Sequence, residues 1–166
     1  MISVKSNGKI LLQDKESNFY LQELVPKATY ERFGVKSIWF LDPRLINTLQ
    51  FVREYFGKAM TVNNWHSGGS FQFRGLRTDD FYYKFVGNKK YESVRKGKMS
   101  QHRFGRAIDC NFSGLTPEEA RTEILSNEGL FLDAGMTTIE DGAFSPTWLH
   151  FDIRHTELEN ILIVKP

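Results

Sequence analysis

The fold and the possible chemistry of this chain depend on the stretch Ser100–Asp109, which reads SQHRFGRAID, and on a second stretch, Trp148–Asp152, which reads WLHFD. His102 precedes Asp109 by seven residues, and the glycine between them lets the chain turn back over a following strand. His150 lies in another run of strand-forming residues. Two imidazoles and one carboxylate are the three protein ligands typical of a catalytic zinc ion, which keeps a fourth position open.

The alternation of side chains along the two strands supports this interpretation. Side chains two residues apart share a strand face, so Asp152 lies beside His150, whereas Phe151 and Ile108 point to the opposite, apolar face. Taken alone, Asp109 could be a buried acid held by backbone donors, and His150 a hydrogen-bonded core histidine. Their occurrence together with a second histidine in the first stretch favours a metal site.

The two motifs, S-x-H-x-x-G-x-A-x-D and W-x-H-x-D, resemble those of the D-Ala-D-Ala carboxypeptidase-like zinc peptidases. This group includes murein endopeptidases, phage endolysins and the hedgehog signalling domain. The turn Gly75-Leu76-Arg77-Thr78 is similar to an upstream element of the family. The resemblance covers residues 42–154 and leaves residues 1–40 as an N-terminal extension.

The resemblance implies a role for each of several residues. His102, Asp109 and His150 would bind Zn²⁺, which would activate a water for hydrolysis of an amide bond in peptidoglycan stem peptides. Arg77 would bind a substrate carboxylate, because a guanidinium pairs with it through two parallel hydrogen bonds. Ser100 would donate a hydrogen bond to the substrate or would serve only in a turn.

The general base is the role in which the sequence departs from the family. Many members place a glutamate three residues before the last histidine, and Thr147 stands at that position here. Asp152 is one candidate for the base, or it orients a ligand histidine instead. Glu140 and its neighbour Asp141 are the other candidates, on the hairpin that precedes the strand of His150. The alternative function is a catalytically inactive zinc domain that binds cell-wall peptide or a protein partner.

Composition limits the partners that the chain can have. Its 166 residues are 40% hydrophobic and 25% charged, as expected for a single globular domain. A net charge of +2 does not indicate a nucleic-acid partner. The basic segment 87–98 is expected to be a solvated loop or a contact for anionic cell-wall polymer, because Tyr91 is its only aromatic residue for stacking on bases.

The chain also shows no sign of membrane insertion or disulfide bonding. It has a single cysteine, no signal peptide and no apolar run of about 18 residues. We therefore expect a monomer that is made in the cytoplasm, has no membrane span and reaches the cell wall by release or by export.

The remaining patterns predict an α+β domain. Asp42-Pro43 and Thr116-Pro117 are start signals for two helices, which should end near Gly57 and Ser126. Asn7-Gly8 indicates a hairpin near the N-terminus. Further strands are expected at 59–63, 107–112, 136–139, 148–153 and 160–164, with a hairpin turn at Asp141-Gly142. The expected architecture is a central, mostly antiparallel sheet with zinc on one face and the helices on the other.

Overall fold

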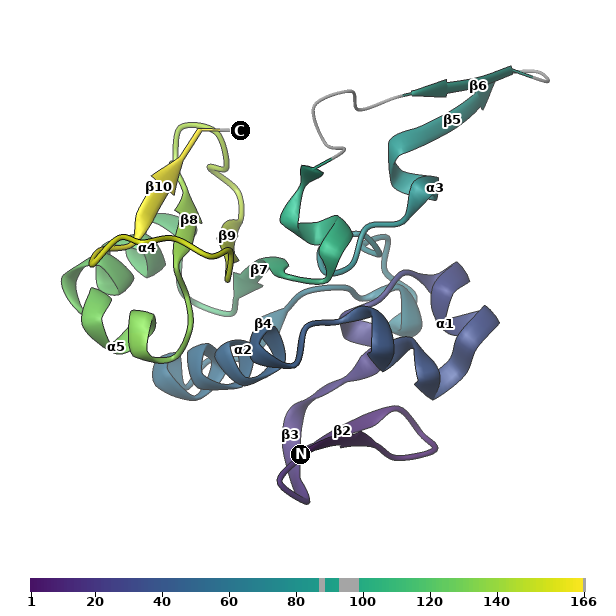
Figure 1. Ribbon diagram of the computed structural model, residues 1–166, viewed down its shortest axis with the longest axis horizontal. Helices are drawn as coiled ribbons and strands as arrows, with labels where there is room; N and C mark the ends of the chain where they lie inside the picture. Colours follow the sequence, from purple (N-terminus) through teal and green to yellow (C-terminus); the bar gives the residue numbers. More distant parts are fainter. Residues whose placement is uncertain (87–88, 93–98, 166) are drawn as a thin grey trace.

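The computed structural model describes residues 1–86, 89–92 and 99–165. Residues 87–88, 93–98 and 166 lie outside this part, and with them most of the basic segment 87–98. The described part of that segment is not a loop, because β6 (Lys89–Glu92) pairs antiparallel with β5 (Tyr83–Val86). Figure 1 shows this pair projecting from α3 (Asp79–Tyr82).

A five-stranded sheet forms the centre of the molecule and confirms the α+β class. Its order is β10-β8-β9-β7-β4, and every pair is antiparallel except β10 with β8. The strands are β4 (Met60–Thr61), β7 (Ala107–Phe112), β8 (Thr138–Glu140), β9 (Leu149–Asp152) and β10 (Leu162–Val164). Asp109 of β7 stands opposite His150 of β9, so pairing alone makes these two residues neighbours.

The strand before β9 differs from the prediction. The strand expected at 136–139 begins at Thr138, and the expected two-residue turn at Asp141-Gly142 is only the start of a longer connection over residues 141–148. This connection is held by Arg121, as described below.

The two main helices begin and end where the sequence signals place them. In α2 (Pro43–Phe56), the Asp42 carboxylate accepts a hydrogen bond from the Arg44 amide, and Gly57 ends the helix with φ +58°. In α4 (Pro117–Ser126), Thr116 and Glu119 form a capping box. The shorter helices are α1 (Lys27–Phe33), α5 (Glu128–Asp133) and the 3₁₀ turns η1 (Leu21–Glu23), η2 (Gly34–Phe40), η3 (Trp65–Ser67) and η5 (Gln101–Phe104).

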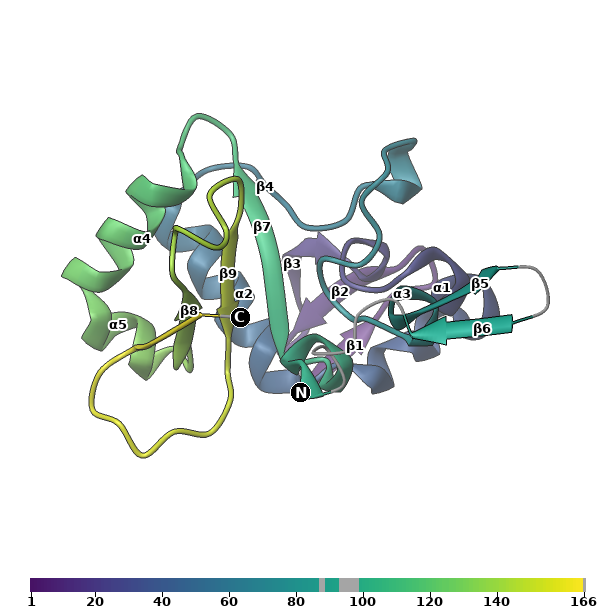
Figure 2. The same ribbon diagram turned by 90° about the horizontal axis from the view of Figure 1, so that it is seen from above.

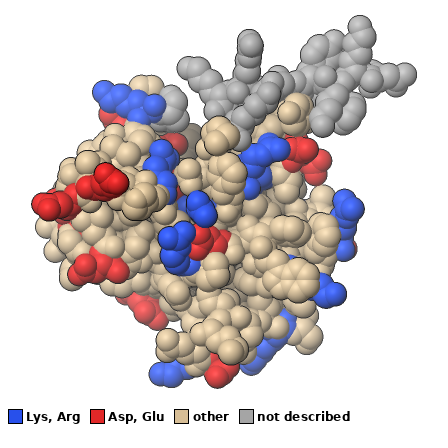
Figure 3. All heavy atoms as spheres, in the orientation of Figure 1, with Lys and Arg blue, Asp and Glu red and all other residues tan. Residues whose placement is uncertain are grey.

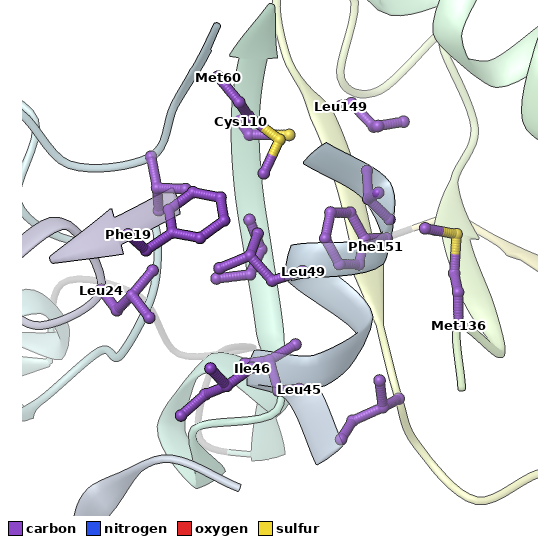
Figure 4. Close-up of a cluster of buried hydrophobic side chains, with 14 of the residues drawn as sticks. Phe19, Leu24, Leu45, Ile46, Leu49, Met60, Cys110, Met136, Leu149 and Phe151 are labelled. Carbon is purple, nitrogen blue, oxygen red and sulfur yellow. The ribbon is translucent and has the colours of Figure 1, made fainter. Parts of the chain in front are cut away.

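The hydrophobic core lies between α2 and one face of the sheet (Figure 4). Leu45 and Leu49 of α2 pack with Ile108 and Phe151, all at most 1% exposed. Each such side chain contributes about 1.5–3 kcal/mol through burial. Phe131 of α5 adds edge-on ring contacts to the aromatic residues of α2. The helices therefore cover the apolar face, and the opposite face of β7 and β9 is left for polar chemistry.

The N-terminal region packs onto the same core. β1 (Ile2–Val4), β2 (Lys9–Leu12) and β3 (Lys15–Tyr20) form a three-stranded antiparallel sheet, with Gly8 at φ +91° in the first turn. Ile10 and Phe19 are buried in the cluster that includes the α2 leucines. Within the described residues, no helix combines the length and apolar character needed to cross a bilayer.

Candidate metal centre

Three ligand atoms meet on the polar face of the sheet. His102 Nε2 lies 3.2 Å from both Asp109 Oδ1 and His150 Nδ1, and the latter two atoms are 2.7 Å apart. Ligand atoms around one tetrahedral zinc, at bond lengths of about 2.0–2.1 Å, lie about 3.3 Å from each other. The three residues are at most 5% exposed. Their side chains could therefore hold a metal ion without a change in the backbone.

The local fold explains why the sequence places His102 there. η5 carries this histidine and ends at Gly105, whose φ is +64°. A Cβ at Gly105 would lie 2.1 Å from the Phe40 carbonyl oxygen, so only glycine lets the turn approach η2 this closely. The chain then enters β7 and brings Asp109 under the imidazole.

Hydrogen bonds on the outer side of each imidazole fix its orientation. His102 Nδ1 lies 2.7 Å from the Gly75 carbonyl oxygen, which can only accept, so this nitrogen carries the proton. His150 Nε2 lies 3.3 Å from Asp152 Oδ2 and donates to it. The inner nitrogen of each ring consequently faces Asp109. Metal-binding histidines are commonly oriented by such a hydrogen bond from their outer nitrogen.

Asp152 lies behind His150 and away from the three ligand atoms. It is 0% exposed, and Arg154 donates to it through Nε at 2.9 Å and Nη2 at 2.5 Å. Burial favours the neutral acid, but hydrogen bonds from Arg154 and His150 outweigh this effect and lower the pKa of Asp152 to about 2. This geometry favours the orienting role for Asp152 and disfavours the role of general base.

Glu140 lies beside the ligand atoms, at the end of β8. Its Oε1 is 3.8 Å from His150 Nδ1, and its side chain is 14% exposed. Burial raises the pKa of Glu140 above its ordinary value. Of Asp152 and Glu140, only Glu140 faces the ligand atoms, and the third candidate, Asp141, lies near Lys165 instead, with Oδ2 4.0 Å from Nζ.

Arg77 contacts Asp109 of the centre, and its contact with a substrate carboxylate stays a prediction. Its Nη2 donates to Asp109 Oδ2, the oxygen that does not face the histidines, and its Nε donates to the Phe73 carbonyl at 2.8 Å. The guanidinium therefore holds the ligand carboxylate in place. Ser100 forms the N-cap of η5 without a side-chain capping bond, and the structure does not bring it into the cluster.

The following pKa values of the ligand residues apply to the protein without a metal ion. Burial lowers the pKa of His102, whereas hydrogen bonds to Asp109 and Asp152 outweigh burial and raise the pKa of His150 to about 9. Burial acts to raise the pKa of Asp109, but the two histidines hold it well below its ordinary value. A proton on His150 thus occupies the place between the ligand atoms that a cation would take.

Sequence reasoning missed three groups that support the centre. The Gly75 carbonyl and Arg154 hold the outer shell, and the spacing of Arg154 two residues after Asp152 was the only available signal. Arg121 of α4 is 4% exposed and donates to the carbonyls of Glu140, Ser145 and Trp148 at 3.1, 2.5 and 2.6 Å. It therefore ties the end of β8, where Glu140 lies, to the connection 141–148, and nothing in the helix pattern indicated its burial.

The donor set of two imidazoles and one carboxylate fits a divalent ion of zinc type. Cys110 lies on the apolar face of β7 and takes no part. No family model, curated protein or solved structure matches this chain, so its resemblance to the zinc peptidases rests on the two motifs and the turn around Arg77.

Proposed function

We propose that this protein is a zinc-dependent peptidase that hydrolyses an amide bond in peptidoglycan stem peptides. The observation that supports this most is the convergence of His102, Asp109 and His150 with both rings fixed by outer hydrogen bonds and a separate carboxylate beside them. A purely structural site would not require a further carboxylate beside the ligand atoms.

The residues of the chain have distinct tasks in this reaction. His102, Asp109 and His150 would hold Zn²⁺, which supplies a water of lowered pKa and polarises the scissile carbonyl. Glu140 accepts the proton of the attacking water and returns it to the leaving amine. Asp152 keeps Nδ1 of His150 directed at the centre, and Arg77 orients the carboxylate of Asp109.

The test is incubation of the zinc-loaded protein with purified muropeptides, with products identified by mass spectrometry. Glu140→Gln should keep zinc and lower kcat by about 10²–10⁴-fold, the usual contribution of a general base. His150→Ala should lose both zinc and activity. Asp133→Asn, an exposed change at the end of α5, serves as the matched acidic control.

A catalytically inactive zinc domain that binds cell-wall peptide or a protein partner is the second candidate. Thr147 favours it, because this side chain stands where many of the similar peptidases carry their glutamate. Stoichiometric zinc with no cleavage of muropeptides, but with saturable binding to them, would support this candidate and overturn the first.

A further inference from the structure

A surface cavity of about 570 Å³ lies beside the metal centre and includes none of its three ligands. Its walls are α1, the end of η2, the segment 76–80 and the end of η5. In Figures 1 and 2, α1 and α3 lie on one side of β7, and α4 and α5 lie on the other. The volume suits a small ligand or one residue of a larger ligand.

Three exposed aromatic residues line the cavity. Phe33, Phe40 and Phe104 are 40%, 41% and 45% exposed, and the first two meet edge to face with centroids 5.0 Å apart. Exposed apolar surface that is gathered around a cavity is typical of ligand-binding sites. The group that binds here therefore has an apolar part.

Three arginines line the same cavity, and each guanidinium lies over an aromatic ring. A guanidinium attracted to the face of a ring can still pair through its N–H donors with a planar anion such as a carboxylate. The distances to the ring centroids are 5.1 Å for Arg32 over Phe33, 4.6 Å for Arg77 over Phe81 and 5.0 Å for Arg103 over Tyr82.

Arg103 has donor capacity that its neighbours do not use. Its Nη2 donates to Asp79 Oδ1 at 2.7 Å, whereas its Nη1 is buried without a hydrogen-bond partner. The Arg103 side chain is 33% exposed, so rotation of its guanidinium would bring the unused Nη1 donor to an acceptor oxygen in the cavity. Asp79 and Asp80 also line the cavity, so its three arginines exceed its acidic residues by one positive charge, which matches a ligand with a single carboxylate.

The cavity connects to the metal centre through Arg77. This residue lines the cavity, donates from its side chain to Asp109 and from its backbone amide to the His102 carbonyl at 3.1 Å. We propose that the cavity is a recognition site for an apolar group that carries one carboxylate. That this group belongs to the substrate cleaved at the metal centre rests on the proposed function.

The test uses the full chain and isothermal titration with N-acetylphenylalanine and with its C-terminal amide. The carboxylate should bind at least about tenfold more tightly than the amide, because it alone forms charge-assisted bonds to a guanidinium. Arg103→Gln should abolish this preference. Arg106→Gln, on the same segment and paired with Asp42, is the matched control and should leave it unchanged.

A second variant fills the cavity instead of removing a charge. Ala28→Trp lies at an exposed position of α1, so the protein should fold, and binding of N-acetylphenylalanine should fall at least about tenfold if the cavity is the site. Equal affinity for acid and amide, or unchanged binding in both Arg103→Gln and Ala28→Trp, would overturn the proposal.

His150→Ala separates this inference from the peptidase. Binding of N-acetylphenylalanine should persist in this variant, because the cavity contains no metal ligand. Loss of binding there would show that the carboxylate goes to the metal centre instead. In an active enzyme, Arg103→Gln should raise KM with little change in kcat, whereas absence of hydrolysis with intact binding would contradict only the peptidase.

Discussion

At the scale of single residues, the centre depends on which nitrogen of each imidazole faces inward. His102 directs Nε2 inward and His150 directs Nδ1 inward. In each ring the other nitrogen donates a hydrogen bond to an oxygen that lies outside the group of ligand atoms. Asp109 divides its two oxygens in the same way, with Oδ2 on Arg77 and Oδ1 toward the rings. Every ligand is thus held from behind.

Removing the carboxylate behind His150 should weaken metal binding without touching a ligand. We expect Asp152→Asn to lower zinc affinity about 10–100-fold, since the ring loses its charged partner and Arg154 loses its counter-ion. Competition against a chromophoric chelator measures this affinity. Asp133→Asn should match the unchanged protein, and equal affinity in Asp152→Asn would show that the outer shell is unimportant.

Arg121 should be important for stability because it satisfies several buried acceptors at once. Arg121→Ala leaves the Ser145 and Trp148 carbonyls without this donor, and we expect a loss of about 2–4 kcal/mol in the free energy of unfolding. Glu118→Ala removes only the exposed partner of Arg121 and should cost less than about 0.5 kcal/mol. Urea denaturation of both variants checks the contrast, and equal losses would contradict it.

At the scale of elements, the sequence predicted the limits of a strand and the starts of two helices, because residues close in sequence determine them. β7 has the predicted limits because its apolar residues alternate, and α2 and α4 begin at their caps because an Asx or Thr side chain with proline starts a helix. The connection 141–148 was not predictable in this way, because the buried arginine that holds it belongs to α4. The role of Arg77 also depends on a residue 32 positions away.

The N-cap of α2 gives a prediction with a definite pH dependence. Hydrogen bonds from Arg44 lower the pKa of Asp42, so the stability contributed by this carboxylate is present above about pH 3.9, its value in the unfolded chain, and is lost as pH falls through the lower folded value. Asp42→Ala should cost about 1 kcal/mol at pH 7.

The same substitution should cost less near pH 2 than at pH 7, because the carboxylate of the unchanged protein is then protonated. Urea midpoints at both pH values measure the difference. An effect of Asp42→Ala that stays constant with pH would show that packing of α2, and not the charge of its cap, is responsible.

At the scale of the whole molecule, one core joins the N-terminal sheet, α2 and the apolar face of the central sheet. On the face shown in Figure 3, basic and acidic groups of the described residues are intermixed without a continuous basic patch. The absence of a nucleic-acid partner, expected from the net charge of +2, stays a prediction.

A metal ion held by η5, β7 and β9 together should stabilise the entire fold. Free zinc at 100 times its dissociation constant should add about 2.7 kcal/mol to the free energy of unfolding. Chelation should lower Tm correspondingly, as followed by calorimetry. His150→Ala should show no shift on adding zinc or chelator, and a Tm of the unchanged protein that ignores both would contradict a specific centre.

The pairing of Asp109 with His150 has a consequence for how the chain reaches its final structure. A slip of one residue between β7 and β9 would present Leu149 to the polar face and leave the other two ligands incomplete. Only the correct alignment forms all three contacts, so zinc selects it over its misaligned competitors. Refolding with zinc present should therefore disfavour misaligned strands and should yield more native protein than refolding in chelator.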